Sequence, residues 1–183
     1  MNKGHSKLSL SELNRVSLSD YKETEKIPLI IVLDNIRSMS NIGSVFRTSD
    51  AFKIQSIHLC GITSKPPHRE IRKTALGATE SVDWEYFEYT MDSVRKLKDE
   101  GYKIVSLEQV TDSTLLHEFQ SLKNEKIAII VGNEVNGVEQ EVIDNSDVCV
   151  EIPQFGTKHS LNVSISTGMV IWHIFQANYL SNK

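Results

Sequence analysis

The chain has 183 residues, a net charge of −4 from 20 Lys and Arg against 24 Asp and Glu, and 39% hydrophobic residues. This length is typical of one domain, and the hydrophobic content is enough to bury a core without disulfides or a metal. The acidic total excludes a uniformly basic nucleic-acid-binding protein, but it is compatible with one basic face. Cys60 and Cys149 each lie in an apolar run, which predicts small core residues and no disulfide framework.

The amino terminus is polar and lacks an apolar segment of signal-peptide length, and no run in the chain approaches the ~20 apolar residues that span a bilayer. We therefore expect a soluble, cytoplasmic protein without a membrane partner. Residues 1–26 are predicted to be an N-terminal extension, with a peripheral helix from about Leu8 followed by a charged linker, because apolar residues are sparse there. Residues 27–183 are predicted to form the functional domain.

Residues 27–183 alternate between strand-like and helix-like segments. Apolar or alternating runs predict strands at 29–33, 56–60, 82–88, 103–107, 127–131 and 148–152. Helical spacing predicts helices at 41–52, 68–78, 91–100, 113–122 and 138–145, and an apolar helix near the carboxyl end. Ser40 or Asn41 is the expected N-terminal cap of the first of these helices.

This alternation predicts an α/β domain with a mostly parallel six-stranded sheet and helices on both faces. Ligands of such sheets bind beyond the carboxyl ends of the strands, so chemistry is expected in the loops that follow them. These loops follow Leu33, Leu107, Val131 and Ile152.

Several familiar cofactor and catalytic signatures are missing. The segment from Gly132 to Gly137 has neither the Gly-x-Gly-x-x-Gly spacing of a dinucleotide site nor the Lys-Ser/Thr end of a P-loop. No Cys or His pair has metal-ligand spacing, so we expect no metal site. Ser160 has no Gly-x-Ser-x-Gly sequence around it, which argues against a hydrolase nucleophile.

Three polar segments remain in the candidate loops. They are Asp34-Asn35 through Asn41-Ile-Gly-Ser-Val-Phe-Arg47, Ile130-Val-Gly-Asn-Glu134-Val-Asn-Gly137, and Ile152-Pro-Gln-Phe-Gly through Ser160-Leu-Asn-Val-Ser. In this order and spacing the segments resemble the SpoU-like (TrmH-like) branch of the SPOUT superfamily, RNA ribose 2′-O-methyltransferases that use S-adenosylmethionine. The resemblance covers about Pro28 to Tyr179.

The resemblance implies features that periodicity does not show. Members of the family have a deep trefoil knot at the carboxyl end, bind the cofactor in a pocket formed by the knotted loops, and work as homodimers. We expect the apolar carboxyl-terminal helix to contribute to the dimer contact through Val170, Trp172, Ile174 and Phe175.

The family's cofactor positions also map onto this sequence. The matching residues are Leu107, Gly132, Ile152, Ser160 and Leu161. Glycine lets a backbone approach a ligand closely, and apolar Ile152 and Leu161 are suited to pack on an adenine ring.

Arg47 matches the family's catalytic arginine, and two roles are open for it. It either assists deprotonation of the ribose hydroxyl or clamps a substrate phosphate while polarising that hydroxyl. A simple general base is chemically difficult because a free arginine gives up its proton only in strongly alkaline solution. Asn35 and Asn41 match polar positions that hold Arg47 or a phosphate, and capping the following helix is their alternative role.

The second and third segments complete the predicted catalytic set. Glu134 is expected to fix the geometry of the arginine, and Ser160 and Asn162 are expected on the substrate side. The alternative for all three is that they satisfy backbone groups in tight loops.

Cationic residues are concentrated on the candidate loops and on the helix predicted after Pro67, whereas acidic residues lie mainly elsewhere. A local basic patch is enough for phosphate contacts in RNA, whatever the total charge. The predicted RNA-binding residues are Arg37, Arg69, Arg72, Lys73, Lys158 and His159.

The third segment departs from the family pattern, because Gln154-Phe155 stand where many members have a methionine and a small residue. We expect this to affect loop shape more than chemistry. No larger RNA-binding domain precedes the match, which favours tRNA over rRNA as substrate. Two alternative functions are an inactive RNA-binding protein of the same fold and another α/β nucleotide-cofactor enzyme.

Overall fold

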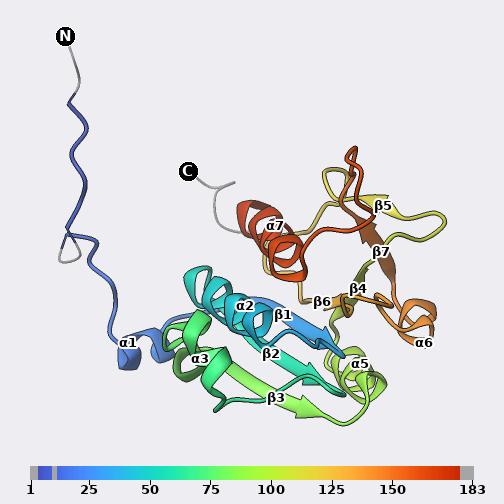
Figure 1. Ribbon diagram of the computed structural model, residues 1–183, viewed down its shortest axis with the longest axis horizontal. Coiled ribbons are helices and arrows are strands. Elements are labelled where there is room, and N and C mark those ends of the chain that lie inside the picture. The colour runs from blue at the N-terminus through green and yellow to red at the C-terminus, as the bar shows by residue number, and fades with distance from the viewer. Residues whose placement is uncertain (1–3, 10–11, 178–183) are drawn as a thin grey trace.

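The computed structural model describes residues 4–9 and 12–177, so Tyr179, at the end of the predicted match, lies outside the described residues. The strands are β1 (Ile27–Asp34), β2 (Ile54–Cys60), β3 (Asp83–Phe87), β4 (Lys103–Leu107), β5 (Thr114–Leu115), β6 (Ile127–Val131) and β7 (Val148–Glu151). They form one sheet in the order β3-β2-β1-β6-β4-β7-β5, and every neighbouring pair is parallel. All strands therefore end at the same edge of the sheet (Figure 1).

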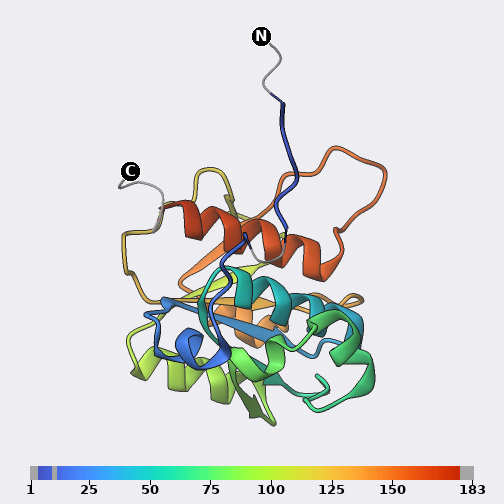
Figure 2. The same cartoon turned by 90° about the vertical axis from the view of Figure 1, so that its left-hand side faces the viewer.

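Helices cover both faces of this sheet, as predicted. The described helices are α1 (Leu18–Glu23), α2 (Met39–Ala51), α3 (Arg69–Ala75), α4 (Ala78–Ser81), α5 (Thr90–Asp99), α6 (Gln140–Asp144) and α7 (Val163–Phe175). One apolar cluster joins the sheet to α2, α3, α4 and α7, and a second joins its other face to α5 and α6 (Figure 2). No helix among the described residues is both long and apolar enough to cross a membrane.

The continuous apolar run of β1 follows from its central place between these two layers. Leu29, Ile31 and Leu33 belong to the cluster under α2 and α7, while Ile30 and Val32 belong to the cluster over α5. Side chains alternate between the faces of a strand, so a strand buried on both faces needs apolar residues at every position. The sequence expectation of a parallel, doubly covered sheet is confirmed.

The helix predicted at 113–122 is wrong, and the sheet has seven strands in place of six. Thr114 and Leu115 form β5, which pairs with the otherwise open edge of β7. A single turn then follows and buries Leu116 and Phe119 in the core. The apolar residues have helical spacing, but a single turn is enough to bury them. The backbone groups of the residues before that turn bond to the edge of β7 in place of a helix.

The N-terminal extension also differs from the prediction. Its helix is the short α1, and residues 4–9 and 12–16 contain no helix and run away from the sheet (Figure 1). The docking of α1 depends on Tyr21, which is buried and whose hydroxyl donates to the carbonyl oxygen of Asp50 at 3.1 Å. The extension is therefore joined to the domain at the carboxyl end of α2.

The predicted dimer contact on α7 is partly wrong. Val170 and Ile174 are each only 1% exposed and belong to the core under this helix, so they are not available to a second copy. Phe175 is half-buried and packs edge-on against Phe52 at a ring-centroid distance of 5.0 Å. Trp172 remains on the surface, at 43% exposed.

The start of α2 is held by contacts that the sequence did not predict. The expected caps Ser40 and Asn41 lie inside the helix, and Ser38 is the N-cap, with its hydroxyl accepting from the Asn41 amide at 3.3 Å. Gly43 faces α3 at very close range. A Cβ atom at this position would lie 2.1 Å from Thr74 Oγ1 and 2.3 Å from the Ile71 carbonyl oxygen, so the two helices require a glycine.

We predict that Gly43→Ala lowers the free energy of unfolding by about 1–3 kcal/mol, the usual cost of overpacking. Gly168→Ala on α7 is the matched control, because the nearest atom to its added Cβ would be Thr48 Cγ2 at 4.0 Å. The control is expected to be neutral or to stabilise by up to about 1 kcal/mol, since alanine favours a helix. Urea unfolding measures both variants, and equal stabilities would contradict the close packing of α2 on α3.

Candidate functional site

A cavity of about 580 Å³ lies beyond the carboxyl ends of three neighbouring strands, β4, β6 and β7. Its wall is made by residues 107–109, 131–137, 151–152 and 159–163, together with Gln154 and Ser166. Small-molecule sites usually have about 300–1,000 Å³, and this edge is where parallel sheets bind ligands. All five predicted cofactor residues, Leu107, Gly132, Ile152, Ser160 and Leu161, line the cavity.

The loop after β6 is held in a fixed shape by its two glycines. A Cβ on Gly132 would lie 1.9 Å from the carbonyl carbon of Gly137, so this glycine is required by the packing of the loop on itself. Asn133 and Gly137 exchange backbone hydrogen bonds of 3.1 and 3.0 Å. Glu108, at the end of β4, accepts from the Val138 amide at 2.9 Å and joins this loop to its neighbour.

Three polar residues from the three motif segments meet at one edge of the cavity. The side-chain amide of Asn41 donates to Glu134 Oε1 at 3.0 Å, and the side-chain amide of Asn162 donates to Asn41 Oδ1 at 3.1 Å. Asn162 is also the N-cap of α7, because its Oδ1 accepts from the Ser164 amide at 3.0 Å. We call Asn41, Glu134 and Asn162 the polar junction. Glu134 and Asn162 line the cavity directly.

The environment of Glu134 favours its ionised form. Partial burial raises the pKa of this carboxyl, but hydrogen bonds from its own amide, from Asn41 and from the amides of Arg37 and Ser38 outweigh that effect. The net pKa is below the ordinary glutamate value. A carboxylate is therefore available at neutral pH to hold the start of α2 against the loop after β6.

Asn35 lies in a different arrangement from the one predicted. Its side-chain amide donates to Asp34 Oδ1 at 3.0 Å and to Glu139 Oε1 at 2.7 Å, and its carbonyl oxygen accepts from the Ile62 amide at 3.1 Å. Asn35 is not among the described residues that line the cavity. It organises the loops after β1 and β2, and its catalytic role stays a prediction.

Arg47 is exposed and is not part of the cavity wall among the described residues. It follows Asn41 by six residues in α2, which corresponds to about 9 Å along the helix axis. No carboxylate among the described residues pairs with it. The structure thus presents Arg47 as an exposed cation on α2, about two turns after Asn41.

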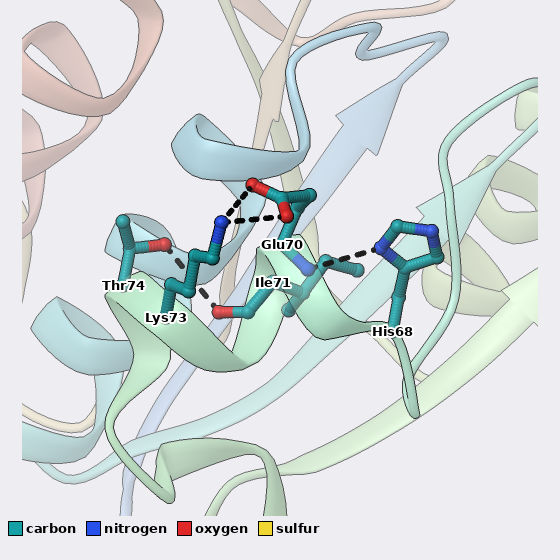
Figure 3. Close-up of polar contacts among 5 residues, drawn as sticks. All are labelled: His68, Glu70, Ile71, Lys73 and Thr74. Atoms are coloured by element: carbon teal, nitrogen blue, oxygen red, sulfur yellow. Dashed lines mark hydrogen bonds and ion pairs between the residues drawn. The ribbon is translucent and has the colours of Figure 1, made fainter.

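The predicted RNA-binding cations fall into two groups. Arg37, Lys158 and His159 are exposed around the cavity, and His159 lines it. The other three, Arg69, Arg72 and Lys73, line a shallow hollow of about 430 Å³ on α3 with Pro67 and His68. Lys73 is bound by Glu70 at 2.7 Å (Figure 3), whereas neither arginine pairs with a carboxylate of the described residues.

Sequence reasoning missed the carboxylates of the cavity other than Glu134. Glu108 and Glu151 lie at the ends of β4 and β7 and line it too, while no Lys or Arg does so among the described residues. Their position at the carboxyl ends of predicted strands could have identified them as cavity residues. The described residues contain no group of three His, Cys, Asp or Glu side chains suited to a metal ion. The cavity is therefore suited to a ligand that carries positive charge.

Comparison with known proteins agrees with this architecture. The model of the SpoU rRNA Methylase family matches residues 28–172. The chain belongs to this family. A 23S rRNA (guanosine-2′-O-)-methyltransferase RlmB from Neisseria meningitidis is 31% identical over 93% of the chain and 67% of its own length.

Two solved structures share the fold. A TrmH/SpoU tRNA modifying enzyme of A. aeolicus has a TM-score of 0.78 at 24% identity, over 87% of this chain and 80% of that one. An AdoMet-bound rRNA methyltransferase from Sinorhizobium meliloti has a TM-score of 0.74 at 25% identity, over 88% of this chain and 60% of that one. The chain of this SpoU family member thus spans 67% of the Neisseria relative and 60% of the Sinorhizobium chain.

We predict that Glu134 adds stability that is lost in acid. Its folded-state pKa is below the unfolded one, so its contribution is complete above the unfolded value, about 4.3, and falls as the pH drops through the folded value. The stability difference between wild type and Glu134→Gln should therefore shrink in urea titrations from about pH 7 to pH 3.

The control is Glu139→Gln, because burial and then the charge of Asp34 raise the pKa of Glu139. The free energy of unfolding of wild type minus that of Glu139→Gln should therefore rise as the pH falls. A pH-independent difference for Glu134→Gln would contradict the hydrogen-bonded carboxylate.

Proposed function

We propose that this protein is an S-adenosylmethionine-dependent methyltransferase that acts on ribose 2′-hydroxyl groups of structured RNA. The observation that carries the proposal is the cavity at the ends of β4, β6 and β7, which contains every predicted cofactor residue in a chain of the SpoU family. Residues 27–183 are proposed as the catalytic domain.

The charge of the cavity supports this cofactor over a phosphate-bearing one. A dinucleotide or nucleotide triphosphate needs cations or a glycine-rich helix start for its phosphates, and the described part of the cavity wall has carboxylates but no Lys or Arg. S-adenosylmethionine carries a sulfonium and supplies an electrophilic methyl group when bound. Glu108, Glu134 and Glu151 stabilise positive charge in the cavity, and the backbone of 131–137 with Ile152 and Leu161 suits the adenosyl part.

The reaction forms a bond between the ribose 2′-oxygen and the methyl carbon while the methyl–sulfur bond breaks. The hydroxyl proton leaves to a base or to solvent, and the by-product is S-adenosylhomocysteine. Ser160 lines the cavity and is suited to orient the hydroxyl. Asn162 also lines the cavity and is fixed by its bonds to Asn41 and to the Ser164 amide. Such an in-line displacement depends mainly on positioning, and it needs no metal.

We infer that Arg47 acts as a phosphate clamp in preference to a general base. It lies off the cavity wall and has no carboxylate partner among the described residues, and a guanidinium offers N–H donors but no acceptor for the hydroxyl proton. A guanidinium binds phosphate through two parallel hydrogen bonds, which would fix the substrate strand against α2.

The two arginines of the α3 hollow are proposed as a further contact with the RNA backbone. Arg69 and Arg72 are exposed and pair with no carboxylate in the described part of the chain, and Thr74 on the same helix donates to the Ser40 carbonyl oxygen at 3.0 Å. That bond ties α3 to the start of α2, where the polar junction lies. Cations on a rigid support can hold the RNA in one orientation.

The RNA class stays open between two candidates. The Neisseria relative is named for 23S rRNA and the A. aeolicus structure for tRNA. The sequence expectation was tRNA, whereas the Neisseria relative, the more identical of these two proteins, is named for rRNA. Methyl transfer to unmodified transcripts of each class separates them.

We also propose the trefoil knot and the homodimer that the family resemblance implies. The strand order supports the knot, because β6 lies between β1 and β4 although it follows both in the chain. The exposed apolar residues Ile165, Met169 and Trp172 of α7 support the dimer, since their spacing places them on one side of the helix.

We predict that Arg47→Ala binds S-adenosylhomocysteine like the wild type but transfers methyl groups to RNA at least about 100-fold more slowly, because the cation acts on the substrate. Calorimetry measures the first property and tritiated-methyl transfer the second. Arg95→Ala is the control, because Arg95 is an exposed arginine of α5 paired with Asp92 at 2.9 Å on the other face of the sheet. Wild-type transfer by Arg47→Ala would contradict the assignment, and binding of NAD in place of S-adenosylhomocysteine would support the rival cofactor class.

We predict that replacing Arg69 and Arg72 together by alanine weakens RNA binding and makes its salt dependence shallower. Each lost phosphate contact should reduce the slope of log K against log salt by about 0.7–0.9. Anisotropy titrations with labelled RNA at several salt concentrations measure the slope. If the slope is unchanged both in this variant and in the Arg95→Ala control, the proposed contact of α3 with RNA phosphates is wrong.

A further inference from the structure

The loop between β7 and α7 has two parts with different surroundings. Its ends line the cavity, through Ile152 and Gln154 on one side and residues 159–162 on the other. Residues 155–158 form a tip that is exposed and takes no part in the cavity wall. The tip therefore stands at the mouth of the proposed active site.

Phe155 opens this tip and is almost fully in solvent. Its side chain is 97% exposed, while the next most exposed large apolar side chain among the described residues, Leu122, is 76% exposed. Phe155 makes no ring contact with another described aromatic residue. An aromatic ring left in water at the mouth of a site is available to a ligand.

The surroundings of Phe155 indicate which ligand is suitable. Its chain neighbours in the tip are Gly156, Thr157 and Lys158, which give the ring no apolar border of the kind that the core of a protein interface needs. No Asp or Glu occurs from residue 152 to the end of the chain, and Lys158 and His159 add positive charge. An exposed aromatic ring beside cations is the arrangement that binds unpaired bases next to their phosphates.

We propose that Phe155 is a stacking platform for a nucleobase of the RNA strand whose ribose enters the cavity. The inference rests on the proposed RNA methyltransferase function and adds a substrate-positioning residue to it. Gln154 lines the cavity and is adjacent to Phe155, so the two Cα atoms are about 3.8 Å apart. A base on Phe155 holds the strand beside the cavity mouth. The Gln154-Phe155 pair, which departs from the family pattern, thus helps to position the substrate as well as shaping the loop.

Three variants of the full chain test this proposal. Phe155→Ala and Phe155→Leu remove the aromatic ring, and Phe155→Trp keeps one. We expect the Kd for an unmodified RNA substrate to rise about 5- to 150-fold in the first two variants and to stay near the wild-type value in the third, as for the loss of one base–aromatic stack. Binding of S-adenosylhomocysteine and the sedimentation mass should stay unchanged in all three.

Two further readouts separate stacking from other effects. RNA should quench the added tryptophan of Phe155→Trp beyond the quenching seen in wild type, which a purely structural role would not produce. Equal RNA affinity for Phe155→Leu and wild type would overturn the proposal, and so would a loss of dimer mass in Phe155→Leu, which would show that a second copy covers the ring. A wild-type protein that binds S-adenosylhomocysteine but no RNA would overturn both this inference and the proposed substrate.

Discussion

The polar junction is the interaction on which the site depends. Glu134 and Asn162 lie 93 and 121 residues from Asn41 in the chain, yet hydrogen bonds of 3.0 and 3.1 Å join all three. The carboxylate is held by amides of the loop before α2, and Asn162 begins α7. Three loops are thus fixed relative to one another at the edge of the cavity. Loss of Asn41, the central residue, would remove one hydrogen bond from Glu134 and one from Asn162.

The sheet makes this junction possible because every strand is parallel. The ends of β4, β6 and β7 meet at one edge, and the polar residues that follow them form one cavity. Gly132 and Gly137 add the close backbone packing that keeps the second motif loop in shape. Arg69 and Arg72, two of the proposed RNA contacts, lie on α3, whereas the carboxylates of the cavity lie beyond the ends of β4, β6 and β7, so a net charge of −4 is compatible with a local basic patch.

Much of the fold was predictable because β1 and β6 are buried on both faces, and that burial requires the continuous apolar runs seen in the sequence. β5 was not predictable, since it has only two residues, too few to show the alternation of a strand. Leu107, Gly132 and Ile152 were placed at the cavity by motif position, and Glu108 and Glu151 were missed although they too end strands. The motif did not predict the contacts of Asn35. Its side-chain amide donates to Glu139, and Asn35 is not among the described residues that line the cavity.

The most direct test of the central claim is the chemical position of the transferred methyl group. A methyl group on the 2′-oxygen removes the nucleophile that cleaves RNA in alkali, so the next phosphodiester bond survives. RNA labelled by this protein from tritiated S-adenosylmethionine should therefore release its label in alkali-stable dinucleotides. Label in mononucleotides that carry a methylated base would contradict the account.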